Sequence, residues 1–198
     1  MNIKKRLVSV LIGAAMVMLL TGRALTLTAY ADEELREASQ CTFVIPSEFK
    51  PSGTKGLFIH KSYPMESCSV MYTVYDNGGG IRLTNREREA AEQNPSGIVD
   101  SSGELTKKHF QDLFSATYNR EYGVDVGYKV SSFDNIAIDG YPGYKVTADY
   151  KAGDEERIFQ TVYMIRSRYK TFVITYQRAD DDDADALFDA SAKTLHVF

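Results

Sequence analysis

The side chains best suited to nucleophilic or acid–base chemistry are scattered along this chain. Its three histidines, His60, His109 and His196, are far apart, and none has a Cys or His neighbour at metal-ligand spacing. The Gly-x-Ser-x-Gly motif that exposes a serine nucleophile on a sharp turn is missing. Cys68 would be nucleophilic only if a histidine lowered the pKa of its thiol. We therefore assign no catalytic residue and expect a non-enzyme, with a hydrolase of unrecognised site as the alternative.

The densest group of candidate metal ligands is a run of aspartates near the C-terminus, formed by Asp180, Asp181, Asp182, Asp183 and Asp185. Several carboxylates close together suit calcium, a hard cation that takes oxygen ligands. The spacing differs from an EF-hand loop, which also requires a glycine and a terminal glutamate that are missing here. Acids at a helix N-terminus can cap free N–H groups and meet the positive end of the helix dipole. We favour this structural interpretation and keep the calcium site as the alternative.

Aromatic residues offer a second candidate site. The chain has 13 tyrosines and no tryptophan. Tyr118, Tyr122 and Tyr128 could line a recess where a long helix meets the strand that follows it, and such a rim can bind a peptide or a glycan. Ordinary core packing is the favoured interpretation.

The first 31 residues have the order of a secretory signal. Lys4, Lys5 and Arg6 precede the apolar run 7–20, and Ala29-Tyr30-Ala31 supplies the small residues of a cleavage site after Ala31. The 14-residue run is short for a bilayer span, which needs about 20 residues. We therefore predict a secreted, extracytoplasmic protein without stable membrane insertion after cleavage.

Cleavage would leave 167 residues, enough for one domain. The remaining 19 Lys and Arg against 27 Asp and Glu give a formal charge of −8, which disfavours nucleic acid and anionic membranes as partners. In an exported protein, Cys41 and Cys68 can form a disulfide, or they can remain two buried thiols. No cofactor is expected, because the glycine run at 78–80 lacks the lysine of a phosphate-binding loop.

The remaining chain divides into a polar lead-in, helical or disordered, over residues 32–40 and a single domain over 41–198. A long irregular insertion, 76–103, contains glycine-rich turns and a short charged segment, 85–93, of helical character. Alternating or apolar residues predict extended segments at 41–45, 57–60, 67–75, 124–133, 136–138, 144–151, 158–165 and 172–176. Asp139-Gly140 predicts a two-residue hairpin turn.

Helical spacing appears twice in the domain. Phe110, Leu113, Phe114, Thr117 and Tyr118 form one apolar stripe that ends before Gly123, and a second stripe spans residues 184–195. The strands at 158–165 and 172–176 are apolar on both faces, so both faces of the sheet need a cover. We expect an α+β fold in three layers, an α/β/α sandwich around a central antiparallel sheet.

The order of these segments resembles the PsbP/Mog1-like family. The resemblance covers residues 41–198 and rests on Phe43-Val44-Ile45-Pro46, on Ile138-Asp139-Gly140-Tyr141-Pro142-Gly143-Tyr144, and on Val173-Ile174-Thr175-Tyr176. The family includes photosystem II PsbP subunits, the Ran-binding protein Mog1 and secreted bacterial proteins of unknown function. The resemblance implies an α/β/α sandwich and a binding or assembly module, and it carries over no functional residue.

Together these observations predict a secreted, non-enzymatic binding or accessory module. Its expected partner is a protein, peptide or glycan at the cell envelope, and the insertion 76–103 with the neighbouring sheet edge is the candidate surface. The two alternatives are a secreted hydrolase and a calcium-dependent cell-surface protein that uses the aspartate run.

Overall fold

The structure is a computed structural model that describes residues 35–76 and 105–198. The expected signal peptide 1–31, its cleavage site after Ala31, the start of the lead-in and nearly all of the insertion 76–103 lie outside the described residues. The expected helical segment 85–93 lies outside them as well.

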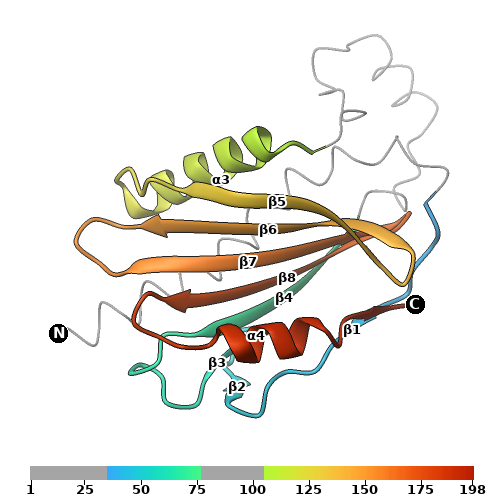
Figure 1. Cartoon of the computed structure of the whole chain (residues 1–198), viewed down its shortest axis with the longest axis horizontal. Helices are drawn as coiled ribbons and strands as arrows, with labels where there is room; N and C mark the ends of the chain where they lie inside the picture. The colour runs from blue at the N-terminus through green and yellow to red at the C-terminus, as the bar shows by residue number, and fades with distance from the viewer. Residues whose placement is uncertain (1–34, 77–104) are drawn as a thin grey trace, which may run out of the picture.

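A seven-stranded antiparallel sheet forms the centre of the domain, in the order β2-β3-β4-β8-β7-β6-β5 (Figure 1). Four of its strands run for ten or eleven residues. The strands predicted from residue 57 onward are present, but the segments predicted at 124–133 and 136–138 form one strand that begins only at Lys129, and the strand at 49–51 was not predicted. The strands are β2 (Phe49–Pro51), β3 (Leu57–His60), β4 (Ser69–Asp76), β5 (Lys129–Ile138), β6 (Tyr141–Lys151), β7 (Arg157–Arg166) and β8 (Lys170–Ala179).

The hairpin between β5 and β6 turns through Asp139-Gly140, as predicted. Both residues have positive φ angles, 52° for Asp139 and 80° for Gly140, which a two-residue hairpin turn of this kind requires. Just beyond it, a Cβ on Gly143 would lie 2.1 Å from the carbonyl oxygen of Met164. Only glycine therefore lets β6 approach β7 this closely.

The two helices match the two predicted stripes. Helix α3 (Lys107–Tyr122) begins after Thr106, whose side chain accepts the N–H of His109, and ends at Gly123, with a φ of 69°. Helix α4 (Asp185–Ala192) buries Phe188 and Ser191. Neither these helices nor any other helix among the described residues combines the length and apolarity that a bilayer crossing requires.

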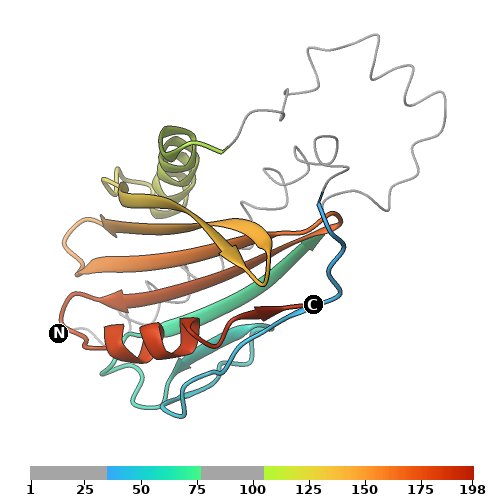
Figure 2. The same cartoon turned by 45° about the vertical axis from the view of Figure 1, so that its right-hand side comes forward.

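The helices cover opposite faces of the sheet, because alternate residues of one strand belong to different core clusters. In β8, Val173 packs with the α3 residues, whereas Ile174 and Tyr176 pack with Phe188 of α4. Figure 2 shows α4 lying along one side of the sheet with α3 beyond the strands. The predicted α+β sandwich, helix on sheet on helix, is therefore confirmed.

The first described residues run along the sheet in an ordered, non-helical path. Between Leu35 and Gln40, the carbonyl of Arg36 accepts the N–H of Arg168, and the backbone N–H groups of Ser39 and Gln40 donate to the carbonyl of Phe198. This part of the lead-in is neither helical nor disordered. The strand predicted over 41–45 is shorter than expected, since β1 is only Cys41–Thr42, paired with β9 (His196–Val197).

Candidate functional site

The long outer strand β5 is the candidate binding surface. It is ten residues long and is the last strand of the sheet, and among the described residues it pairs with β6 alone. The edge of such a strand presents backbone N–H and C=O groups that can pair with another extended chain. Residues Asp134, Asn135 and Ala137 of β5 are exposed to solvent.

The register of the hairpin fixes which backbone groups point outward. Ile138 pairs with Tyr141 across a two-residue turn, so that its N–H and C=O face β6. Hydrogen bonding alternates along an antiparallel pair, and the N–H and C=O of Ala137 and Asn135 therefore point away from β6. Pro142, opposite Ala137, is consistent with this register because its missing N–H would have faced β7.

Side chains of α3 occupy the first half of this edge. The backbone N–H of Val130 donates to Oε1 of Gln111 at 2.9 Å, and Nζ of Lys107 donates to the carbonyl oxygen of Ser131 at 3.0 Å. A β-bulge between Val130 and Ser132 separates this capped part from the regular ladder that follows. The part of the edge that no other described segment pairs with or caps is thus 133–137, which we call the open β5 edge.

The tip of the hairpin is fixed to the C-terminal strand. Oδ2 of Asp139 accepts the backbone N–H of Val197 at 2.9 Å and lies 3.2 Å from Nδ1 of His196. The Val197 N–H is the main reason that the pKa of the Asp139 carboxyl is lowered, with His196 adding to the effect. Tyr141 also donates its hydroxyl to the carbonyl of Glu37 at 2.7 Å. These contacts hold the open β5 edge in a defined position.

The opposite edge of the sheet is built differently. Strand β2 has only three residues, and two of them are Lys50 and Pro51. Short length, a lysine and a proline are the features by which natural sheets prevent pairing along an edge. The two edges therefore differ in their capacity to accept a further strand.

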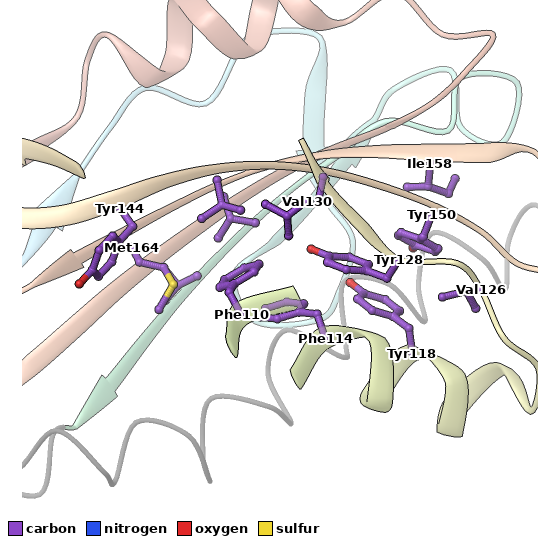
Figure 3. Packing of buried hydrophobic residues seen from close by; sticks show 14 of the residues in the cluster. Phe110, Phe114, Tyr118, Val126, Tyr128, Val130, Tyr144, Tyr150, Ile158 and Met164 are labelled. Atoms are coloured by element: carbon purple, nitrogen blue, oxygen red, sulfur yellow. The ribbon is translucent and has the colours of Figure 1, made fainter. Parts of the chain in front are cut away.

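The predicted aromatic recess is packed core. Tyr118 and Tyr128 are almost fully buried, with ring centroids 5.3 Å apart and an interplanar angle of 11°, and Tyr122 is partly buried beside them. Tyr150 stacks on Tyr118 at 4.5 Å (Figure 3). Burial raises the pKa of the Tyr118, Tyr128 and Tyr150 hydroxyls. Tyr118 and Tyr128 therefore pack in the core, as the favoured interpretation expects, and they offer no exposed rim to a ligand.

Two buried glutamines, Gln160 and Gln177, form hydrogen bonds beside these tyrosines, and no sequence motif indicated their role. Nε2 of Gln160 on β7 donates to the Tyr118 hydroxyl and to Oε1 of Gln177 on β8, both at 2.8 Å. The Tyr128 hydroxyl donates to Oε1 of Gln160 at 3.3 Å. In the sequence, Gln160 is a polar residue within the largely apolar segment 158–165, which could have indicated a buried hydrogen bond. Its partners could not be predicted, because they lie on other elements.

The aspartate run does not act as a side-chain helix cap. The N-cap of α4 is Ala184, without a side-chain cap hydrogen bond, and Asp185 is the acid of the first turn. Asp185 forms two hydrogen bonds with the guanidinium of Arg178, at 2.7 and 2.9 Å. Asp182 is buried and accepts the backbone N–H of Ser67 at 2.7 Å, whereas the remaining acids, Asp180, Asp181 and Asp183, are exposed. The five carboxylates therefore lie in different surroundings: one is buried, one is paired with an arginine, and three are exposed to solvent.

The two cysteines are buried free thiols in the same core cluster, so the disulfide alternative is not realised in the structure. Burial raises the pKa of the Cys41 thiol to about 12 and that of Cys68 further still. Deprotonation of either thiol is correspondingly unfavourable.

The histidines take part in local structure. Nδ1 of His60 accepts the N–H of Ser62 at 3.2 Å, and its ring lies edge-on to Phe49. His109 is exposed in the first turn of α3, and His196 lies beside Asp139. The structure thus places the three histidines on three separate elements.

Comparison with solved structures supports the fold. Cyanobacterial PsbP (CyanoP) from Synechocystis sp. PCC 6803 matches with a TM-score of 0.50 and 19% identity, over 85% of this chain and 91% of its own. LpqN of Mycobacterium tuberculosis, described as involved in cell envelope biogenesis, matches with a TM-score of 0.45 and 11% identity, over 85% and 87% of the two chains. No family model matches the sequence, and no curated protein is similar to it by sequence. The match to CyanoP shows that the chain has a PsbP/Mog1-like fold.

Proposed function

We propose that this protein is an exported, non-catalytic accessory module that binds an extended segment of a partner protein along the open β5 edge. The observation that carries the proposal is the asymmetry of the sheet. One edge is short and contains a lysine and a proline, and the other is long, regular over 133–137 and exposed at Asp134, Asn135 and Ala137. Outward N–H and C=O groups would supply the main-chain hydrogen bonds of an added strand.

The groups most capable of chemistry are engaged in holding the fold, which supports a binding role. Gln160 joins the buried tyrosines, Asp139 fixes the hairpin tip, and the cysteine thiols have raised pKa values. The signal-like segment 1–31 supports export, and the charge of −8 without that segment supports a partner other than nucleic acid.

Site-specific crosslinking in the native cells tests the proposal. A photoreactive amino acid at Asn135 would lie on the open β5 edge, and the same amino acid at Lys50 on β2 is the matched control at the opposite edge. We expect a defined protein adduct at position 135 and none at position 50. Equal labelling at both edges would contradict the proposed surface.

A second variant tests whether main-chain pairing is responsible. Ala137→Pro removes an N–H that points outward and leaves the β5–β6 ladder its own donors, because proline is tolerated on edge strands. We expect loss of the adduct at position 135 together with an unchanged circular dichroism spectrum. An adduct that persists in the folded proline variant would rule out strand addition at this position.

A further inference from the structure

Three side chains with metal-binding atoms meet where the loop before β4 contacts the turn before α4. The loop between β3 and β4 supplies Glu66 and Cys68, and the turn between β8 and α4 supplies Asp182. Each side chain offers one ligand atom, and these atoms all lie within 4.8 Å of one another. We call this group the Glu66–Cys68–Asp182 cluster.

Backbone contacts hold the cluster together in the fold. Ser67, between two of the donors, gives its N–H to Oδ2 of Asp182 at 2.7 Å, and the N–H of Asp182 donates to the carbonyl of Ala179. The carbonyl of Cys68 accepts the N–H of His60 at 3.1 Å. A ligand carboxylate oriented by a neighbouring N–H is a usual feature of protein metal sites.

A polar side chain in the same loop adds an observation independent of the three donors. Ser67 is only 2% exposed, and its Oγ is buried without a hydrogen-bond partner among the residues that the structure describes. Buried hydroxyls are ordinarily satisfied, so the unpartnered hydroxyl in the loop that supplies Glu66 and Cys68 is available to a further polar group such as a hydrated cation.

The nearby cation Arg178 acts on Cys68 through its charge, but it donates no hydrogen bond to the side chains of the cluster. Arg178 directs Nε and one terminal nitrogen to Asp185, and its other terminal nitrogen to the carbonyl oxygens of Ala179 and Asp182. The exposed acids Asp180, Asp181 and Asp183 belong to the same turn as Asp182. The surroundings of the cluster are therefore electronegative, which favours a further positive charge.

We propose that Glu66, Cys68 and Asp182 form a binding site for a thiophilic divalent cation of the Zn²⁺ type. Zn²⁺ takes thiolate and carboxylate ligands in four-coordinate sites, whereas Ca²⁺ takes six to eight oxygens. In a tetrahedral site, ligand atoms lie about 3.3–3.6 Å apart, so the three donors need to approach by at most roughly 1.5 Å. Half-buried Glu66 can make this movement, and water would take the fourth position.

The protonation of the metal-free cluster is consistent with this assignment. Burial raises the pKa of the Cys68 thiol, and the nearby carboxyls of Asp182 and Glu66 add to the effect. Burial also raises the pKa of Asp182, against the hydrogen bond from Ser67. A divalent cation would displace the proton of the Cys68 thiol and would supply the charge that stabilises ionised Cys68 and Asp182.

Titration of the purified, reduced protein with Co²⁺ tests the site, because cobalt bound to a thiolate has a near-ultraviolet charge-transfer band. We expect the band to saturate at one Co²⁺ per chain, to disappear when Zn²⁺ is added, and to be unaffected by millimolar Ca²⁺. Cys68→Ser should abolish it, whereas Cys41→Ser, which alters the other buried free thiol, should retain it.

A conservative variant keeps the test decisive if Cys68→Ser fails to fold. Glu66→Gln alters a half-buried side chain of the loop and should weaken Co²⁺ binding at least about tenfold while the far-ultraviolet spectrum stays unchanged. No charge-transfer band, a band retained in folded Cys68→Ser, or a band lost equally in Cys41→Ser would overturn the proposal. The cluster would then be only a structural contact between the loop before β4 and the turn before α4.

Discussion

Replacing Gln160 by leucine should lower the free energy of unfolding by about 2–4 kcal/mol. The side chain makes three buried hydrogen bonds, to Tyr118, Gln177 and Tyr128. Each polar group left without a partner lowers the free energy of unfolding by about 1–3 kcal/mol, whereas the larger apolar surface that leucine buries raises it by up to about 2 kcal/mol. Glutamine and leucine have similar volumes, so the cost comes from polar groups rather than from a cavity.

Gln177 allows a sharper version of this experiment. Its Nε2 is already unpartnered among the described residues, and Gln177→Leu removes only the bond that Gln160 donates. The double leucine variant should therefore be more stable than the sum of the two single changes implies, by about 1 kcal/mol. Urea denaturation followed by far-ultraviolet circular dichroism measures all three variants.

A surface glutamine provides the control for the side-chain exchange itself. Gln40 is exposed, and Gln40→Leu should change stability by less than about 0.5 kcal/mol. If Gln160→Leu behaved like Gln40→Leu, the buried network would contribute nothing measurable. Strict additivity in the double variant would separately refute direct coupling between the two glutamines.

Two further predictions concern the β5–β6 hairpin. Gly143→Ala should destabilise the protein by about 2–4 kcal/mol in the same urea assay, because the new methyl group would lie 2.1 Å from the carbonyl oxygen of Met164. An effect under about 0.5 kcal/mol would mean that β6 and β7 can move apart without cost. Asp139→Asn should destabilise the protein at neutral pH and lose this effect in acid. The folded-state pKa of Asp139 is lowered, so its contribution is present above the unfolded pKa and disappears as the pH falls through the folded pKa. Urea midpoints at several pH values measure this difference, and a gap between variant and parent that persisted at the lowest pH would contradict it.

Local sequence signals were sufficient to predict the strands, turns and helix ends that depend only on neighbouring residues. The alternation from Tyr144 to Tyr150 predicted β6, Asp139-Gly140 predicted its turn, and Gly123 predicted the end of α3. Strands that are apolar on both faces predicted helices on both sides of the sheet, because each face must be covered. These inferences need only the periodicity of a strand or a helix and the backbone preferences of glycine.

The contacts that distinguish the candidate sites are long-range, and the sequence gives no measure of them. Ser67 and Asp182 are 115 residues apart, so the aspartate run alone could not indicate that one member faces a loop containing a cysteine. The order β4-β8-β7-β6-β5 likewise decides that β5 is an edge strand. The inner strand β6 also alternates between polar and apolar residues, so alternation alone could not indicate that β5 has a single paired neighbour among the described residues.

The two proposed sites can be tested independently, because the topology separates them. The metal ligands lie in the loop before β4 and the turn after β8, whereas the open β5 edge lies three strands beyond β8. Adjacent strands are about 4.8 Å apart, so at least roughly 14 Å of sheet lies between the two sites. A Glu66→Gln variant should therefore keep the crosslink at position 135, and Ala137→Pro should keep the cobalt band. A loss of both signals in one variant would indicate that the fold, rather than a site, had been altered.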